Sequence, residues 1–198
     1  MTTPTGEELT PSLTLHGFEF HRLDAAAVAA EPERWARAYR EVYAASSSRP
    51  EHSDPPIEQR LAGHLQRPGF ELVAAFAPDE SATGIPAGFV YGYQLPPDTP
   101  WWDGLTPPPD AEVVRERPGR TVAVCEALVA GGHRKSGLGE ALLGYFLIGR
   151  PEQRTTALVA LGNAVILDRF TSRGWHQLGE LRPLPGWAPH AALLLPLR

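Results

Sequence analysis

A short turn between a predicted strand and a predicted helix constrains this sequence most strongly. The turn, residues 133–139, reads His-Arg-Lys-Ser-Gly-Leu-Gly, follows an apolar run at residues 121–130 and precedes an apolar-periodic run at residues 138–148. Glycines let the backbone approach an anion closely, and the first N–H groups of a helix, together with the helix dipole, favour negative charge there. The pattern therefore predicts an anion-binding turn of the kind that holds phosphate groups.

Two familiar phosphate loops do not fit this turn. A Walker loop ends in Gly-Lys-Ser or Gly-Lys-Thr, whereas the order here is Lys135-Ser136-Gly137. A Rossmann fingerprint needs a third small residue where Leu142 stands. The plain alternative is an ordinary strand-to-helix turn without a ligand.

Composition limits the classes of protein and partner. The 198 residues are 42% hydrophobic, which suits one globular domain, so we expect a disordered arm at residues 1–12 and a single domain at residues 13–198. The net charge of −5 and the lack of a basic stripe argue against a nucleic-acid partner. No leader and no membrane-length apolar run is visible, so we expect a cytoplasmic protein without a membrane partner.

Cysteine and histidine usage points away from disulfide and metal chemistry. The only cysteine is Cys125, which we expect to be a small buried hydrophobe rather than a nucleophile. The seven histidines show no metal-ligand spacing, so no metal is expected, and His133 beside the turn receives no role.

Hydrophobic periodicity predicts an α/β fold with one central mixed sheet. About seven strands are expected, at residues 15–23, 70–76, 87–93, 121–129, 155–161, 175–178 and 191–195. About four helices are expected, at residues 33–45, 57–65, 138–148 and 164–173, the last closed by Gly174. An irregular, proline-rich insert occupies residues 96–119.

Two sequence blocks resemble the GNAT superfamily of acyl-CoA N-acyltransferases. The first is Arg134-x-x-Gly137-x-Gly139, which that family places between a strand and a helix. The second is the helix that begins with Asn163-Ala164 and ends before Gly174-Trp175. The resemblance covers residues 15–198 and implies a mixed, mostly antiparallel, twisted sheet. Residues 101–105 and 181–185 are similar to those of uncharacterised actinobacterial members.

The resemblance implies that acetyl-CoA is the cosubstrate and assigns residues to it. The turn would hold the pyrophosphate through Arg134 and through the backbone of Lys135, Ser136, Gly137, Leu138 and Gly139. The main chain of Leu128 and Val129 would pair with the peptide-like pantetheine arm, as an added strand does. Asn163 would contact the pantetheine or order the cleft, and Phe170 would lie beside the cofactor.

Glu126 is the first candidate for the general base. It lies in the middle of an apolar strand, where a carboxylate is costly unless it is paired or used, and burial raises its pKa toward the working range. Transfer to an amine needs such a base, because a primary amine is mostly protonated at pH 7. The alternatives are a glutamate satisfied by an arginine or a backbone donor, and one that only binds the substrate. Strand alternation places Cys125 on the opposite face from Glu126.

Phe170 departs from the family pattern. Many members have a tyrosine seven residues after the motif asparagine, where its phenol can protonate the departing thiolate, and phenylalanine has no proton to give. Either water or another hydroxyl replaces the tyrosine, or the activity is lost and only the binding fold remains.

Trp101, Trp102 and Asp103 in the insert are the candidate acceptor-binding residues. Aromatic rings beside an acid suit a cationic amine through cation–π contacts and charge pairing. The alternative is that the two tryptophans simply pack against the sheet.

Three functions remain open from the sequence. The first is an N-acetyltransferase that moves an acetyl group from acetyl-CoA directly to a primary amine of a small molecule or peptide, in a ternary complex. The second is a catalytically idle CoA-binding regulatory module of the same fold. The third is a self-associating structural protein. A homodimer is compatible with the resemblance, although no interface is recognisable in the sequence.

Overall fold

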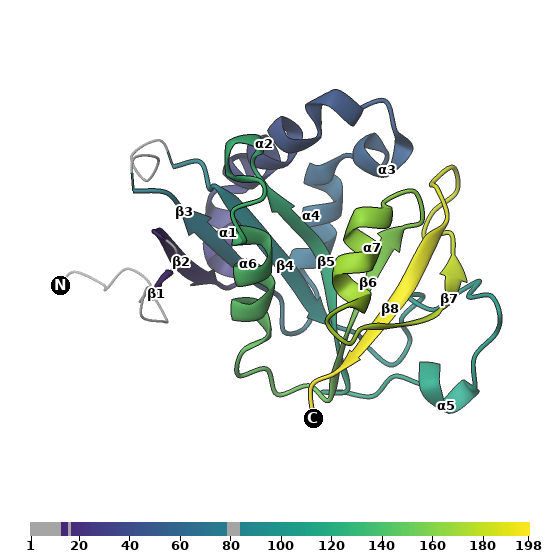
Figure 1. Cartoon of the computed structure of the whole chain (residues 1–198). Helices are drawn as coiled ribbons and strands as arrows, with labels where there is room; N and C mark the ends of the chain where they lie inside the picture. Colours follow the sequence, from purple (N-terminus) through teal and green to yellow (C-terminus); the bar gives the residue numbers. More distant parts are fainter. Residues whose placement is uncertain (1–12, 16, 79–83) are drawn as a thin grey trace.

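The computed structural model describes residues 13–15, 17–78 and 84–198, which form a twisted sheet with helices on both faces (Figure 1). The predicted N-terminal arm, residues 1–12, lies outside the described residues. In the described part, eight strands pair in the order β1-β2-β3-β4-β5-β6-β8-β7. They are β1 (Leu13–Leu15), β2 (Phe18–Leu23), β3 (Glu71–Phe76), β4 (Gly88–Gln94), β5 (Thr121–Val129), β6 (Arg154–Ala160), β7 (His176–Leu181) and β8 (His190–Pro196).

Every neighbouring pair of strands is antiparallel except β5 and β6. The predicted mixed, mostly antiparallel α/β sheet is therefore confirmed. The additional strand is the three-residue β1, which folds back on β2 and so divides the strand expected at residues 15–23.

The helices divide between the two faces of the sheet, which gives two apolar cores. Val28, Trp35 and Leu61 of α1, α2 and α4 pack in one core, and Leu138, Leu142 and Phe146 of α6 pack in the other. The helices are α1 (Ala25–Ala30), α2 (Pro32–Tyr43), α3 (Pro50–Ser53), α4 (Ile57–Leu65), α5 (Ala111–Val114), α6 (Leu138–Leu147) and α7 (Ala164–Thr171).

The long predicted helices are present, and three short ones were missed. Helix α4 has the predicted bounds because Ile57 and Leu61 form one buried face. Helices α1, α3 and α5 span six residues or fewer, which is too short for a periodic pattern. Helix α1 nevertheless has a start signal, because the Asp24 side chain accepts a hydrogen bond from the Ala27 amide at 2.8 Å.

A β-bulge in β5 sets the direction of the candidate base. Tyr91 pairs with Glu126 and Gly92 pairs with Val124, so Cys125 is the extra residue. A Cβ atom at Gly92 would lie 1.9 Å from the Ala123 carbonyl oxygen, so this close approach requires glycine. The bulge interrupts the alternation of the strand. The prediction that Cys125 and Glu126 face opposite sides is therefore wrong: both line one cleft on the α2 and α4 side.

Strands β5 and β6 separate after a short parallel pairing. The pairing joins Thr121–Val124 to Arg154–Ala157 and stops there, while β5 continues to Val129. Beyond Val124, the edge of β5 that faces β6 has no partner strand in the described part of the chain. This divergence opens the sheet between α6 and α7 (Figure 1).

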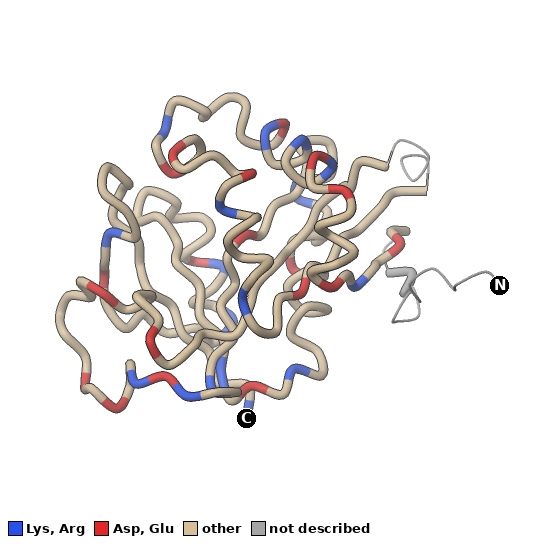
Figure 2. The backbone as a smooth tube through the Cα atoms, turned by 180° about the vertical axis from the view of Figure 1, so that it is seen from behind, with Lys and Arg blue, Asp and Glu red and all other residues tan. Residues whose placement is uncertain are grey.

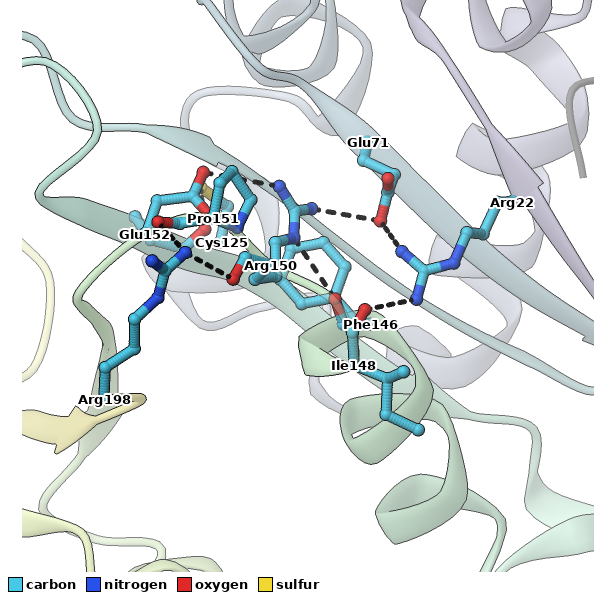
Figure 3. Close-up of polar contacts among 10 residues, drawn as sticks. Arg22, Glu71, Cys125, Phe146, Ile148, Arg150, Pro151, Glu152 and Arg198 are labelled. Atoms are coloured by element: carbon cyan, nitrogen blue, oxygen red, sulfur yellow. Dashed lines mark hydrogen bonds and ion pairs between the residues drawn. The ribbon is translucent and has the colours of Figure 1, made fainter.

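Arginines hold the C-terminal end of α6. Arg22 donates hydrogen bonds to the carbonyls of Tyr145 and Ile148, the latter at 3.0 Å, and it pairs with Glu71 at 2.6 Å. Arg150 donates to the Phe146 carbonyl at 3.2 Å and reaches the same Glu71 carboxylate at 3.1 Å (Figure 3). These contacts satisfy carbonyl groups that a helix end leaves without partners, and they fix α6 to the sheet.

Charges of both signs are interspersed along the backbone (Figure 2). No helix among the described residues is long and apolar enough to span a membrane.

Candidate cofactor and acceptor cleft

A cleft of about 1490 Å³ runs along the opening between β5 and β6. One end is lined by the glycine turn, α6 and α7, and the other by α2, α4 and the segment before β8. The volume exceeds that of a usual single-ligand pocket. The cleft therefore has room for two ligands side by side.

The glycine turn has the backbone conformation of an anion-binding nest. Lys135 and Gly137 both have positive φ, at 67° and 85°, and Gly137 immediately precedes the first residue of α6. Alternation of left- and right-handed residues turns successive N–H groups toward one point. A left-handed conformation is unusual for lysine, and such outliers cluster at functional sites.

The amides of this turn are available to a ligand. No hydrogen bond found among the described residues uses the amides of Lys135, Ser136, Gly137 or Gly139. The Leu138 amide donates to the Ser136 hydroxyl at 3.3 Å, and that hydroxyl in turn donates to the His133 carbonyl at 2.7 Å. The turn is thus held by its serine while most of its amides stay unused at the start of α6.

Two cations flank these amides. Arg134 donates to the carbonyl oxygens of Val129 at 3.5 Å and Val42 at 3.4 Å, so it crosses the end of β5. Lys135 makes no ion pair with any described residue. Both residues line the cleft, where their charge favours an anionic group.

The walls beside the turn come from β5 and α7. Leu128 and Val129 lie on the unpaired edge of β5, and their backbone is the part that a strand-like ligand can meet. Asn163 begins α7, is exposed, and its side chain caps nothing. Phe170 also lines the cleft, with its ring 4.8 Å from that of Trp175 in an edge-on contact. All the predicted cofactor residues except Ser136 thus line one cleft.

Glu126, the candidate base, lines the same cleft. Its side chain is 11% exposed, and it accepts a hydrogen bond from the Tyr43 hydroxyl at 3.0 Å. The nearest cation is Arg60, whose guanidinium lies 3.9 Å from the other carboxylate oxygen. The Arg60 contact is the arginine pairing expected from the sequence as the alternative to a base, and the base role stays a prediction.

Burial and the neighbouring groups shift the pKa of Glu126 in opposite directions. Desolvation raises the pKa of the Glu126 carboxyl above its usual value, while Arg60 and the Tyr43 hydrogen bond act in the opposite sense. Burial of Tyr43 and the nearby Glu126 carboxylate raise the pKa of the Tyr43 hydroxyl, which therefore stays protonated as a donor. A carboxylate with a raised pKa and one fixed donor is suited to accept a proton.

Sequence reasoning missed the residues that surround Glu126. Arg60 donates to the Tyr39 hydroxyl at 2.6 Å, and burial raises the pKa of Tyr39 to about 12. The Tyr43 ring stacks on His52 with 4.1 Å between the ring centroids. The available signal was the Tyr39 and Tyr43 spacing of four, read as core packing, together with an arginine next to the apolar face of α4.

The predicted acceptor residues do not all reach the cleft. Trp101 and Asp103 line it, and the Trp101 indole donates to the Thr156 hydroxyl at 3.3 Å. Trp102 instead is 8% exposed, donates to the Glu116 carboxylate at 3.0 Å and is absent from the cleft lining. Successive residues of this turn point in different directions, so Trp102 is a core residue and we expect no acceptor contact from it.

A tie between distant segments crosses over the acceptor side. The Trp187 indole donates to the Asp54 carbonyl at 2.6 Å, and Arg182 donates to the Trp187 carbonyl at 2.7 Å. The Arg60 guanidinium lies 5.6 Å from the centre of the Trp187 ring. The loop between β7 and β8, whose Trp187 lines the cleft, is therefore joined to the segment that follows α3.

Metal ligands do not gather in the described part of the chain. No three His, Cys, Asp or Glu side chains among those residues converge as a metal site requires.

The fold is that of GNAT acetyltransferases. A GNAT-family acetyltransferase structure from Desulfovibrio desulfuricans has a TM-score of 0.61 and 17% identity, over 91% of this chain and 99% of that chain. The ribosomal-protein-S18-alanine N-acetyltransferase of Escherichia coli has a TM-score of 0.60 and 14% identity, over 91% and 94%. The yncA structure from Salmonella typhimurium, solved with acetyl-CoA, has a TM-score of 0.55 and 17% identity, over 91% and 94%.

Sequence comparison does not extend this likeness. No protein-family model and no curated protein sequence matches the chain. The structural likeness, at these identities, establishes the fold, and the predicted resemblance to the GNAT fold is confirmed.

Proposed function

We propose that this protein is an acetyltransferase that moves an acetyl group from acetyl-CoA to a primary amine. The observation that carries the proposal is the turn of unused amides, flanked by Arg134 and Lys135, that opens on the unpaired edge of β5. The cleft continues from there to a buried carboxylate. The GNAT fold, which one neighbour shows with acetyl-CoA bound, supports the same reading.

The residues present fit coenzyme A. Three consecutive amides from Lys135 to Gly137 and two cations match a pyrophosphate, and the β5 backbone at Leu128 and Val129 matches a peptide-like arm. Val165, 65% exposed on α7, gives this wall an apolar surface. Bound acetyl-CoA supplies the thioester carbon that the amine attacks.

The chain's own groups would then manage the proton and the acceptor. Glu126 accepts the proton that the ammonium must lose before the neutral amine attacks, and Tyr43 and Arg60 hold the carboxylate toward the cleft. The new bond joins the amine nitrogen to the acetyl carbon, and the carbon–sulfur bond breaks. We propose that a water passes the second proton of that nitrogen to the leaving thiolate, since Phe170 has no proton to give. Glu126 afterwards releases its proton to solvent.

A test of the cofactor site introduces a negative charge into the turn with Gly137→Glu. A carboxylate at the centre of the amide nest repels phosphate, so acetyl-CoA affinity should fall at least a hundredfold. The matched control is Gly149→Glu, because Gly149 also has positive φ, at 75°, also has open space around its Cβ position and lies outside the cleft lining. Calorimetry with CoA and thiol release from acetyl-CoA across an amine panel are the two readouts.

The outcomes separate the proposal from its alternatives. Equal CoA affinity in the wild type and in Gly137→Glu would contradict the assignment of this turn to the cofactor. Tight CoA binding without acetylation of any amine would instead favour a CoA-binding regulatory module, which is the function that Phe170 in place of a tyrosine supports. Tight binding with turnover supports the enzyme.

A further inference from the structure

Helix α4 presents a basic stripe to the acceptor side of the cleft. Arg60, His64 and Arg67 are spaced four and three residues apart, and all three line the cleft. Arg67 lies just past the helix, but its amide donates to the His64 carbonyl at 2.9 Å, so the turn continues through it. The stripe therefore starts beside Glu126 and extends away from it along the axis of α4.

Arg60, the cation nearest to Glu126, has an acidic partner, whereas Arg67, farther along the stripe, has none among the described residues. Arg60 shares its charge with Glu126 and Tyr39. Arg67 lies 6.0 Å from the centre of the Tyr93 ring, and among the described residues no carboxylate forms an ion pair with it. The outer part of the stripe thus carries one positive charge without an acidic partner.

His64 adds a neutral donor beside Arg67. Its Nδ1 lies 3.2 Å from the Tyr91 hydroxyl, whose only acceptor among the described residues is this nitrogen. Tyr91 is 1% exposed, so its buried O–H must donate, and the proton of the imidazole then lies on Nε2. Burial and the nearby charges of Arg60 and Arg67 lower the pKa of His64 to about 4, which keeps the ring neutral at pH 7.

From this placement we infer that the acceptor is a small amine that also carries a carboxylate, held by Arg67 and the Nε2–H of His64 while its amine meets Glu126. The inference rests on the proposed acetyltransferase function and names the substrate class of that same site. One guanidinium and one neutral donor match a single negative charge.

The spacing along α4 gives the length of this acceptor. His64 and Arg67 lie four and seven residues beyond Arg60, or roughly 6 and 10 Å along a helix that rises about 1.5 Å per residue. An α-amino acid that used its α-amine would be too short to join the two ends. The Tyr93 ring lies 5.1 Å from the His64 ring and 6.0 Å from the Arg67 guanidinium, which suits an acceptor with an aromatic or extended body.

The Trp187 to Asp54 hydrogen bond links the loop before β8, whose Trp187 lines this part of the cleft, to the segment before α4. We take this link to restrict the space open to the acceptor, and the test therefore uses small free amines.

The test compares acceptors that differ only in the anionic group. The pairs are 4-(aminomethyl)benzoate with benzylamine, 6-aminohexanoate with hexylamine, and glycine with methylamine as the short pair, with 6-aminohexyl phosphate as the dianionic arm. We expect kcat/KM to favour the carboxylate at least tenfold in the two long pairs and not in the short one. The phosphate should be a poorer acceptor than 6-aminohexanoate.

Variants of Arg67 tie the preference to this residue. Arg67→Gln should raise the KM for 4-(aminomethyl)benzoate about tenfold with little change in kcat or in the KM for benzylamine. Arg67→Glu should reverse the preference, and Arg67→Lys should restore part of it. Arg37→Gln is the control, because Arg37 is an exposed arginine paired with Glu41 outside the cleft lining.

Direct binding separates this inference from the proposed function. Calorimetry in the presence of CoA should show tighter binding of 4-(aminomethyl)benzoate than of benzylamine, and NMR should show the pKa of His64 rising when the carboxylate binds. Equal affinity and equal kcat/KM for the paired amines, or an Arg67→Gln enzyme with an unchanged preference, would overturn the inference while leaving acetyl transfer intact. Carboxylate-dependent binding without turnover would support the inference and reject the enzyme.

Discussion

Glu126 is a buried acid whose chemistry depends on a few atoms around it. Arg60 and Tyr43 hold the ionised carboxylate, and desolvation works against them and raises its pKa. The group is therefore a proton acceptor at neutral pH that loses this capacity at a higher pH than an exposed glutamate does.

This balance predicts a pH profile. Because the folded-state pKa of Glu126 is raised above 4.5, the fraction able to act as a base declines as the pH falls toward that raised value, and kcat/KM should decline with it. Glu126→Gln should lower kcat about a hundredfold or more and remove this acidic limb, while CoA affinity stays the same. Steady-state kinetics between pH 5 and 9, as an assay range of roughly two units on each side of neutrality, provides the measurement.

Glu41→Gln is the control for that profile, because Glu41 is an exposed glutamate of α2 that is paired with Arg37 and lies outside the cleft lining. Any change at the alkaline end, where the acceptor loses its ammonium proton to solvent, should be common to all three proteins. A Glu126→Gln enzyme with an unchanged acidic limb would exclude Glu126 as the base.

The residues that form the glycine turn could be identified from the sequence, because a motif with fixed spacing needs no tertiary information. The surroundings of Glu126 could not. Tyr43 and Arg60 are 83 and 66 positions away in the chain, and their meeting depends on how α2 and α4 pack. The error at Cys125 arose from a bulge whose only local sign is Gly92 on the neighbouring strand.

At the scale of elements, α6 extends from the glycine turn to the arginines Arg22 and Arg150. Its N-terminus carries the unused amides, and its C-terminus is held by Arg22 and Arg150. Cations at a helix C-terminus and an anion at its N-terminus both agree with the helix dipole.

Arg22→Met should therefore lower the free energy of unfolding without altering the cleft. The substitution removes hydrogen bonds to two helix carbonyls and the ion pair with Glu71 from a side chain that is 16% exposed, which should cost about 1–3 kcal/mol. Chemical denaturation measures this loss, and the KM for acetyl-CoA should remain near the wild-type value.

Arg40→Met is the matched control for that change. Arg40 also contacts two carboxylates, Glu33 and Glu58, but it is 48% exposed, so its loss should cost less than about 1 kcal/mol. Equal destabilisation by the two variants would show that capping of α6 contributes nothing beyond a surface ion pair.

The major elements were predictable because each has a clear apolar period. The short helices and β1 were not, because three to six residues contain too little of a period. Tertiary contacts rather than local propensity hold those segments in place.

At the scale of the whole molecule, the hydrogen bond between Trp187 and Asp54 links two loops that lie far apart in the chain. The two residues are 133 positions apart, and their hydrogen bond joins the loop before β8 to the segment before α4. No sequence pattern signals such a contact.

Trp187→Phe keeps an aromatic ring beside Arg60 and removes the indole donor. We expect faster hydrogen exchange in residues 182–189 and a several-fold higher KM for the acceptor, with little change in the KM for acetyl-CoA. Trp35→Phe is the control, since the Trp35 indole nitrogen is buried without a hydrogen-bond partner among the described residues. Unchanged exchange in residues 182–189 would show that the tie does not hold this loop.

The basic stripe of α4 and the tyrosines of α2 belong to one continuous stretch, residues 32–67, whereas the phosphate turn comes from residues 134–139. Under the proposed function, the α2 and α4 groups around the acceptor and the turn around the donor come from separate parts of the sequence. Trp101 and Trp187 add to the acceptor end from outside residues 32–67. A new acceptor specificity is therefore best sought by varying side chains of residues 32–67 first, while residues 134–139 stay unchanged.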